Sequence, residues 1–109
     1  QYNFSGTGSL PIGLYRVSSD WQEENITWNN QPASSPDVEY TRYAYNTTDA
    51  WRSWSISDLV RGWMDGSITN YGMLLKPVSE PATNEAYFDS SDYYITANRP
   101  RMEISYYVP

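Results

Sequence analysis

One stretch of the chain, from Trp51 to Pro77, has the pattern of a strand, a short helix, a turn and a second strand, and it constrains the fold most. Four apolar residues recur at helical spacing, which predicts one short helix over about Ser57–Asp65. They are Leu59, Val60, Trp63 and Met64. The Ser57 hydroxyl is suited to cap the first turn, and Gly66 is suited to end the helix because glycine adopts positive φ without steric cost.

The apolar run after the helix, Tyr71–Leu75, predicts a strand that is covered on both faces. We expect Trp63 to be buried against Leu74 or Leu75, since short connections usually join neighbours in space. Further strands are predicted where apolar and polar residues alternate or where aromatic and β-branched residues gather. These segments are Leu10–Val17, Val38–Tyr45, Trp54–Ile56, Ala86–Asp89 and Arg101–Val108.

The arrangement of these segments predicts the fold class. Several short strands, long polar loops and one helix are typical of an all-β protein rather than of repeated βαβ units. With 109 residues and no internal repeat, the chain is expected to form a single antiparallel β-sandwich domain over residues 1–109.

The chain contains no cysteine and no histidine. This excludes disulfides, thiolate chemistry and every nucleophile that histidine activates, and it removes the usual zinc ligands. The net charge of −6 argues against a nucleic-acid partner, because neutralising phosphates needs a basic surface. No apolar run approaches the roughly 20 residues of a membrane-spanning helix, so no membrane insertion is expected. Abundant Ser, Thr, Asn and Tyr are typical of an extracellular or cell-surface β-protein.

Large apolar side chains define the predicted core. A large indole is usually buried with its N–H satisfied, which favours the core over a ligand-binding surface for four of the five tryptophans. The spacing of Trp21 and Trp28 would place both indoles on one side of a helical turn. The residues predicted for the core are Trp21, Trp28, Trp54, Leu59, Trp63, Leu75 and Ile104.

Eleven tyrosines are more than the core of a chain this small can hold. An exposed aromatic face with a polar tip suits a sugar ring, which has apolar C–H faces and many hydroxyls. Arginine binds carboxylate or sulfate bidentately, so arginines could read an acidic polysaccharide. Alternatively, the tyrosines shield cross-strand pairs on an ordinary sheet and the arginines pair with acidic residues. The candidate carbohydrate-binding residues are Tyr43, Tyr45, Tyr93, Tyr94, Arg42 and Arg99.

No residue is predicted to be catalytic. Glycoside hydrolysis needs two carboxylates about 5–10 Å apart across a cleft, and nothing in the sequence fixes such a pair. No metal or other cofactor is expected, although acidic side chains and carbonyls together could hold calcium. Three sequons for N-glycosylation begin at Asn3, Asn25 and Asn46, and they gain weight from the extracellular composition.

Three groups of residues share their order and spacing with a known family. The first is Leu14-Tyr15-Arg16-Val17, then Trp21 and Ile26-Thr27-Trp28-Asn29-Asn30-Gln31-Pro32; the second is Trp51-x-x-Trp54, Leu59-Val60, Trp63, Gly66 and Asn70 to Lys76; the third is Phe88, Ser90-Ser91 and Arg99 to Ile104. In these groups the chain resembles the disaggregatase-related repeat family, or DNRLRE domains. The resemblance implies a jelly-roll-like β-sandwich of secreted or surface-anchored proteins, and a chain that corresponds to the C-terminal two-thirds of the family domain.

Together these observations favour a non-catalytic module that binds polysaccharide in an extracellular or cell-surface protein. One alternative is a structural building block of a surface layer or fibre, and another is a fragment of a polysaccharide-degrading enzyme. We expect strands from the same precursor or from a neighbouring copy to complete the sheets by β-augmentation. The contrasting expectation is a smaller sandwich whose edges are blunted by Pro11, Pro36 and the loops.

Overall fold

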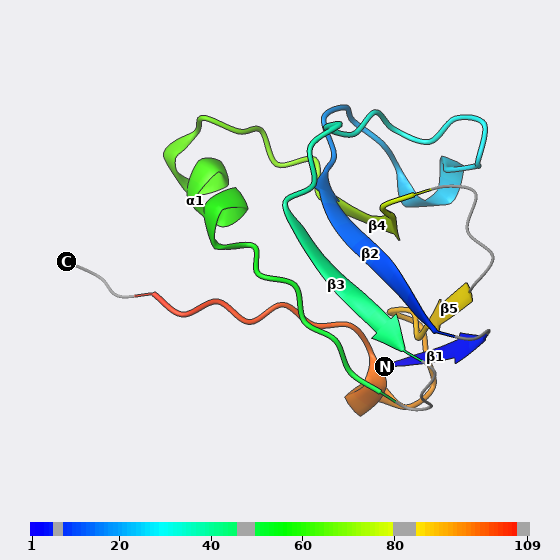
Figure 1. The fold of residues 1–109 in the computed structure, drawn as a ribbon. Helices are drawn as coiled ribbons and strands as arrows, with labels where there is room; N and C mark the ends of the chain where they lie inside the picture. Colours follow the sequence, from blue (N-terminus) through cyan, green and yellow to red (C-terminus); the bar gives the residue numbers. More distant parts are fainter. Residues whose placement is uncertain (6–7, 46–49, 80–84, 107–109) are drawn as a thin grey trace.

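The computed structural model describes residues 1–5, 8–45, 50–79 and 85–106, and its strands form two antiparallel sheets (Figure 1). The three-stranded sheet has the order β3-β2-β4, and the two-stranded sheet pairs β1 with β5. One α-helix, α1, lies beyond β3 in the view of Figure 1. The elements are β1 (Tyr2–Ser5), β2 (Ser9–Arg16), η1 (Glu23–Asn25), β3 (Tyr40–Tyr45), α1 (Ser57–Asp65), β4 (Met73–Pro77), β5 (Glu85–Phe88) and η2 (Thr96–Asn98).

The core lies where the two sheets meet. Alternation along β2 turns Leu10 and Ile12 toward β1, since side chains of a strand point alternately to its two faces. The buried cluster is Tyr2, Phe4, Leu10, Ile12 and Ala44, with Ala50, Trp54 and Ala86 packed against it. Two antiparallel sheets that share this core, together with one short α-helix, confirm the prediction of an all-β sandwich.

Proline is tolerated within the central strand because of where pairing with β4 ends. Pro11 lies opposite Tyr43 of β3, whereas the last pair between β2 and β4 is Ile12 with Pro77. The Pro11 carbonyl accepts a hydrogen bond from the Val78 amide at 3.0 Å, so the side of the residue that lacks an N–H faces the end of β4. Proline there removes no bond from the regular ladder.

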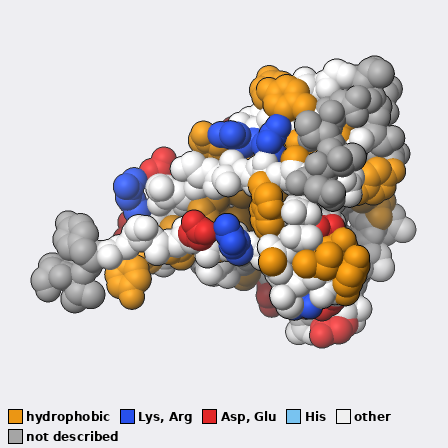
Figure 2. Space-filling model, turned by 90° about the horizontal axis from the view of Figure 1, so that it is seen from below, with side chains coloured by type: hydrophobic (Ala, Val, Ile, Leu, Met, Phe, Trp, Pro, Cys, Tyr) orange, Lys and Arg blue, Asp and Glu red, His pale blue; other side chains and the backbone are white. Residues whose placement is uncertain are grey.

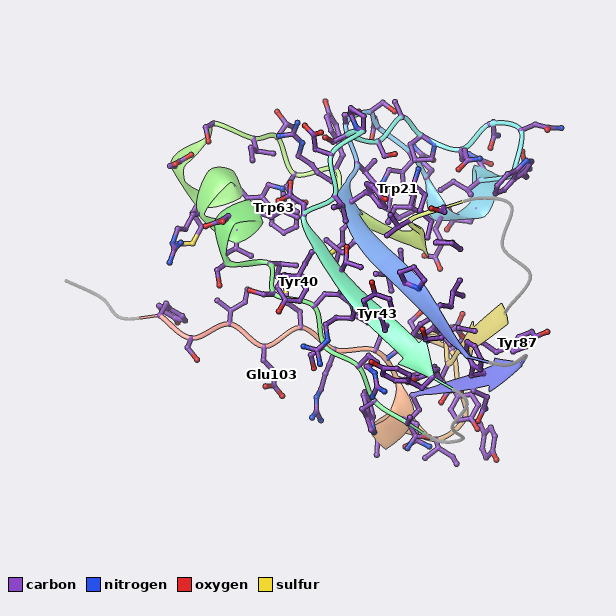
Figure 3. The ribbon with its side chains drawn as sticks, in the orientation of Figure 1. Trp21, Tyr40, Tyr43, Trp63, Tyr87 and Glu103 are labelled. Atoms are coloured by element: carbon purple, nitrogen blue, oxygen red, sulfur yellow. The ribbon has the colours of Figure 1, made fainter. Side chains whose placement is uncertain are left out.

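The helix occupies the predicted residues, but it begins differently from the expectation. Ser57 is the first helical residue and Ile56 the N-cap, with no side-chain capping hydrogen bond. Gly66 ends the helix at φ 82°, as the sequence predicts. Leu59 is 1% exposed, and Trp63 is half-buried on the side of α1 that faces the three-stranded sheet (Figure 3).

Two tryptophans predicted for the core are exposed. Trp28 is 75% exposed, and Trp21 is partly exposed with its indole over Gly72 and its N–H donated to the Tyr71 carbonyl. The helical spacing does not apply, because only the short 3₁₀ turn η1 separates the two residues within a long loop. Trp21 therefore covers the start of β4, and Trp28 is directed away from the core.

Two aliphatic residues predicted for the core are also exposed. Leu75 is 39% exposed because the two-stranded sheet covers the Leu10 and Ile12 end of β2 and leaves the inner face of β4 open. Ile104 is 52% exposed because residues 101–106 form no strand. The predicted strand Arg101–Val108 is thus wrong over 101–106, and its remaining residues, 107 and 108, lie outside the described part. Trp54, by contrast, is half-buried against the core.

Candidate functional site

An open groove of about 620 Å³ runs between the inner face of the three-stranded sheet and two extended segments, residues 51–56 and 100–103. Figure 2 shows apolar side chains gathered beside the C-terminal segment, with basic and acidic side chains next to them. The residues that line the groove are Gln1, Tyr2, Leu14, Trp51, Arg52, Ser53, Trp54, Ile56, Met73, Leu75, Phe88, Asp89, Pro100, Arg101, Met102 and Glu103.

The floor of the groove is set by strand register. Leu14 of β2 pairs with Leu75 of β4, and Arg16, two residues further along β2, pairs with Met73. Directly paired residues share a face of the sheet, so Leu14, Leu75 and Met73 form one apolar surface. Leu14 is buried within this surface, whereas Leu75 is 39% exposed, so the open part of the floor lies along β4.

Aromatic rings form one wall of the groove. Phe88 of β5 lies between Tyr2 and Trp54, with centroid distances of 5.5 Å and 6.1 Å. The Trp54 indole donates its N–H to the Ile12 carbonyl at 3.0 Å, which fixes the ring across the core boundary. Its orientation is therefore set before any ligand arrives, which lowers the entropic cost of binding.

Trp51 and Arg101 close the groove on the outer side. The guanidinium carbon of Arg101 lies 5.4 Å from the centroid of the Trp51 ring, within the range of a cation–π contact. Arg101 Nε also lies 3.2 Å from Glu103 Oε1, and both side chains are largely exposed. Trp51 itself is 40% exposed, so part of its indole faces solvent in the groove.

Arg52 joins the groove to the free edge of β3. Its Nε donates to the Tyr43 carbonyl at 2.9 Å, and its Nη1 donates to the Trp51 carbonyl at 2.8 Å. The guanidinium carbon is also 5.2 Å from the Tyr45 ring and 5.5 Å from the Tyr2 ring. These contacts hold the planar cation in one orientation and satisfy a carbonyl on an edge strand, where it would otherwise invite another chain.

The six predicted carbohydrate-binding residues do not form one surface, and none of them lines the groove. Tyr43 and Tyr45 are exposed on β3, and Figure 3 shows Tyr43 on that strand. Arg42 pairs with Ile12 and Tyr43 pairs with Pro11, so alternation places Arg42 on the face opposite Tyr43. Arg42 therefore does not share a face of the sheet with these two tyrosines, and the assignment of the six residues to carbohydrate binding stays a prediction.

The other three predicted residues come together in the loop after β5. The Tyr93 and Tyr94 rings are 4.9 Å apart at an angle of 40°, and Tyr94 is 81% exposed. Arg99 Nε donates to the Tyr93 carbonyl at 2.7 Å. This bond ties the guanidinium to the backbone of the loop and makes Arg99 a support for the tyrosine pair.

The structure describes two of the three predicted glycosylation sites. Asn3 lies on β1 and Asn25 in η1, both exposed, whereas Asn46 lies outside the described residues. Within the described ranges, no group of three or more acidic, histidine or cysteine residues could hold a metal ion. In that same part of the chain, no helix is long and apolar enough to cross a membrane.

The groove residues that the sequence reasoning missed come from segments far apart in the chain. Trp51 and Arg52 precede the helix, whereas Arg101 and Met102 belong to a segment that the alternation assigned to a strand. The available signal was Trp51 itself, an indole among polar residues at the start of an extended segment. Such a position favours a surface role over the core.

A family comparison decides what kind of module this groove belongs to. The model of carbohydrate-binding module family 96 matches residues 2–106. The chain belongs to carbohydrate-binding module family 96. The match includes both extended segments and both sheets, and therefore every groove residue except Gln1. The name suggested by the resemblance, disaggregatase-related repeat, is not confirmed, whereas the expectation of a carbohydrate-binding module is.

Family 96 membership is accompanied by similarity to much longer proteins. The chain is 27% identical over 112 residues to "tRNA nuclease WapA" of Bacillus subtilis strain 168, and 27% identical over 108 residues to "tRNA3(Ser)-specific nuclease WapA" of Bacillus spizizenii. Each alignment covers 99% of this chain and 4% of the relative, so the chain spans a small fraction of the curated relatives that it matches. No solved structure matches the chain significantly.

Proposed function

We propose that this family 96 module binds polysaccharide in the groove between segments 51–56 and 100–103, as a non-catalytic part of an extracellular or cell-surface protein. The observation that carries the proposal is the groove itself, which combines aromatic faces with fixed charged groups. Family membership supports a carbohydrate as the ligand. The groove volume lies within the range of small-ligand sites, about 300–1,000 Å³.

The lining suits the two sides of a sugar ring. Pyranose rings present apolar C–H faces, which pack on indole and phenyl rings such as those of Trp51 and Phe88. Their hydroxyls need donors and acceptors at the ring edge. Arg52 and Arg101 supply N–H donors, and Asp89 and Glu103 supply carboxylate acceptors. The groove is open, so a polymer could lie along it without a free chain end.

Affinity electrophoresis tests the proposal directly. The chain is run in gels that contain a β-glucan, a xylan, a mannan or a polyuronate, so that neutral and acidic polymers are compared. Trp51→Ala is expected to raise the apparent Kd at least tenfold, because aromatic anchors carry a large share of binding energy. Trp51→Phe should retain part of the affinity. Met64→Ala, on the exposed side of α1, is the matched control and should bind as wild type.

The tyrosine pair Tyr93–Tyr94 is a second candidate contact for the polymer. The specific observation is that Tyr94 stacks on Tyr93 and still exposes most of its ring. Tyr94→Ala and Tyr43→Ala are measured in the same gels. Loss of binding in these variants with unchanged binding in Trp51→Ala would move the site from the groove to the tyrosine surfaces.

A competing role for the C-terminal segment is to pair with a sheet edge of another copy, so that the chain is a structural building block. Residues 101–106 take part in no strand, and Met102, Ile104 and Tyr106 alternate along them with exposed side chains. An extended segment with this pattern is suited to add to a sheet edge. Sedimentation at micromolar concentration distinguishes the two cases, since a groove that binds sugar is expected in a folded monomer. An assembled chain that binds no polymer would favour the structural role.

The nuclease names of the relatives are not extended to this chain. Each relative is matched over only 4% of its length, and this chain has a net charge of −6. A surface that neutralises phosphates would need an excess of basic residues.

A further inference from the structure

The loop between β2 and β3 presents an exposed indole that the groove does not use. Trp28 is 75% exposed, and its indole N–H has no protein partner among the described residues. In Figure 1 this loop follows the end of β2, and Trp28 is not among the residues that line the groove. Trp28 is therefore separate from the groove and free to contact a molecule in solution.

The base of the loop is closed by hydrogen bonds. The Ser18 amide donates to the Ala33 carbonyl at 2.8 Å, and the Ala33 amide donates to Ser19 Oγ at 2.8 Å. Val17 and Ser34 form a β-bridge just outside these bonds. A compact surface loop whose ends meet in this way is frequently functional, because it projects from a rigid scaffold.

The turn that carries Trp28 is held on both sides by side-chain hydrogen bonds. The Thr27 amide donates to Asn30 Oδ1, while Asn30 Nδ2 donates to the Asn25 carbonyl at 2.7 Å. Gln31 Nε2 donates to the Trp28 carbonyl itself at 3.1 Å. Asn30 and Gln31 thus stabilise the turn, and they hold the backbone of Trp28 in place with its indole exposed before any ligand binds.

We propose that Trp28 is a second sugar-contact point, at which one pyranose ring of the same polysaccharide packs its C–H face on the indole. The proposal rests on the function proposed for the groove. An exposed indole face suits the apolar C–H face of a sugar ring, and the family points to a carbohydrate as the ligand. Two contact points on one polymer raise the apparent affinity through effective concentration, without any new contact in the groove.

The test compares three variants in the gels that retard the wild-type chain, among β-glucan, xylan, mannan and polyuronate. Trp28→Ala is expected to raise the apparent Kd about tenfold, the effect of losing one aromatic anchor. Trp28→Tyr should lose less than threefold, since an aromatic face is retained. The apparent Kd of Asn30→Ala should lie between the values of these two variants, because the indole is kept but its turn is loosened. Circular dichroism of each variant should match wild type, as the side chain lies outside the core.

The outcomes separate this proposal from the function of the groove. If Trp28→Ala binds as wild type while Trp51→Ala is weakened, the second contact point is wrong and the groove stands. Equal losses in Trp28→Ala and Trp28→Tyr would also overturn it, because a stacking contact should survive in tyrosine. A wild-type chain that none of the gels retards would overturn both proposals.

Discussion

The guanidinium of Arg101 packs on the Trp51 ring and thereby joins two extended segments that lie far apart in the sequence. Arg101 makes its other side-chain contact with Glu103, within its own segment. No backbone hydrogen bond links residues 100–106 to the remainder of the described chain. One outer wall of the groove is therefore positioned largely by side-chain contacts around Arg101.

Replacement of Arg101 should weaken sugar binding more than it weakens the fold. We expect Arg101→Ala to lower the free energy of unfolding by less than about 1 kcal/mol, because the pairs it breaks are exposed and screened. The same variant should raise the apparent Kd for polysaccharide severalfold, since the 100–103 wall is no longer held. Arg101→Lys keeps the charge, so its apparent Kd should lie between the values of the wild type and Arg101→Ala. Urea denaturation and affinity electrophoresis measure the two effects, and a large stability loss with normal binding would contradict the expectation.

The helix should depend on Leu59 rather than on its other apolar residues. Leu59 is 1% exposed, so Leu59→Ala should cost about 2–5 kcal/mol of unfolding free energy, from lost burial and the cavity left behind. Met64 on the same helix is 76% exposed, and Met64→Ala should change the free energy of unfolding by no more than about 0.5 kcal/mol. Chemical denaturation of both variants checks the contrast, and similar values for the two would show that the helix is packed differently.

The hydrogen bond from the Trp54 indole N–H should contribute to the free energy of unfolding in addition to the packing of the ring. It donates to the Ile12 carbonyl at 3.0 Å, next to the buried cluster. Trp54→Phe retains an aromatic ring but removes this donor, so we expect a loss of about 1–3 kcal/mol from the unsatisfied carbonyl and the smaller ring. Trp51→Phe, in the exposed wall, is the comparison and should leave the unfolding free energy almost unchanged. Thermal melts would contradict the assignment if both substitutions had equal effects.

The end of the helix contains a carboxylate with a defined pH response. Hydrogen bonds from the Ser67 side chain and backbone lower the pKa of Asp65 below its ordinary value of 3.8. A lowered pKa in the folded state stabilises the fold above the unfolded pKa, and this contribution is lost as pH falls through the folded value. Ser67→Ala should raise the Asp65 pKa toward 3.8 in an NMR titration. An unchanged pKa would show that the Ser67 hydroxyl does not act on the carboxylate.

The parts of the structure set by local spacing could be predicted from the sequence. The helix follows from apolar residues at helical intervals, and Gly66 ends it because glycine adopts positive φ without steric cost. The alternation of Leu10, Ile12 and Leu14 likewise identifies the inner face of β2. These features depend on residues close together in the chain.

The features that the sequence did not reveal are of two kinds. Some depend on contacts between distant segments, and others lie where the spacing of residues resembles that of a different element. The groove exists because two segments meet beside a face that the second sheet leaves open, and no local pattern encodes that meeting. Alternation of Met102 and Ile104 predicted a strand, yet a strand also needs a partner edge. The spacing of Trp21 and Trp28 fits a helix, but Asn29, Asn30 and Pro32, which follow Trp28, favour a loop.

The most direct test of sugar binding in the groove is an NMR titration of the five tryptophan indole N–H signals with the polysaccharide fragment that affinity electrophoresis selects. If the groove binds sugar, the Trp51 signal shifts in a saturable manner, whereas the signal of Trp63, on the helix and outside the groove lining, stays in place. Saturable binding of the same fragment with an unchanged Trp51 signal would contradict sugar binding in the groove.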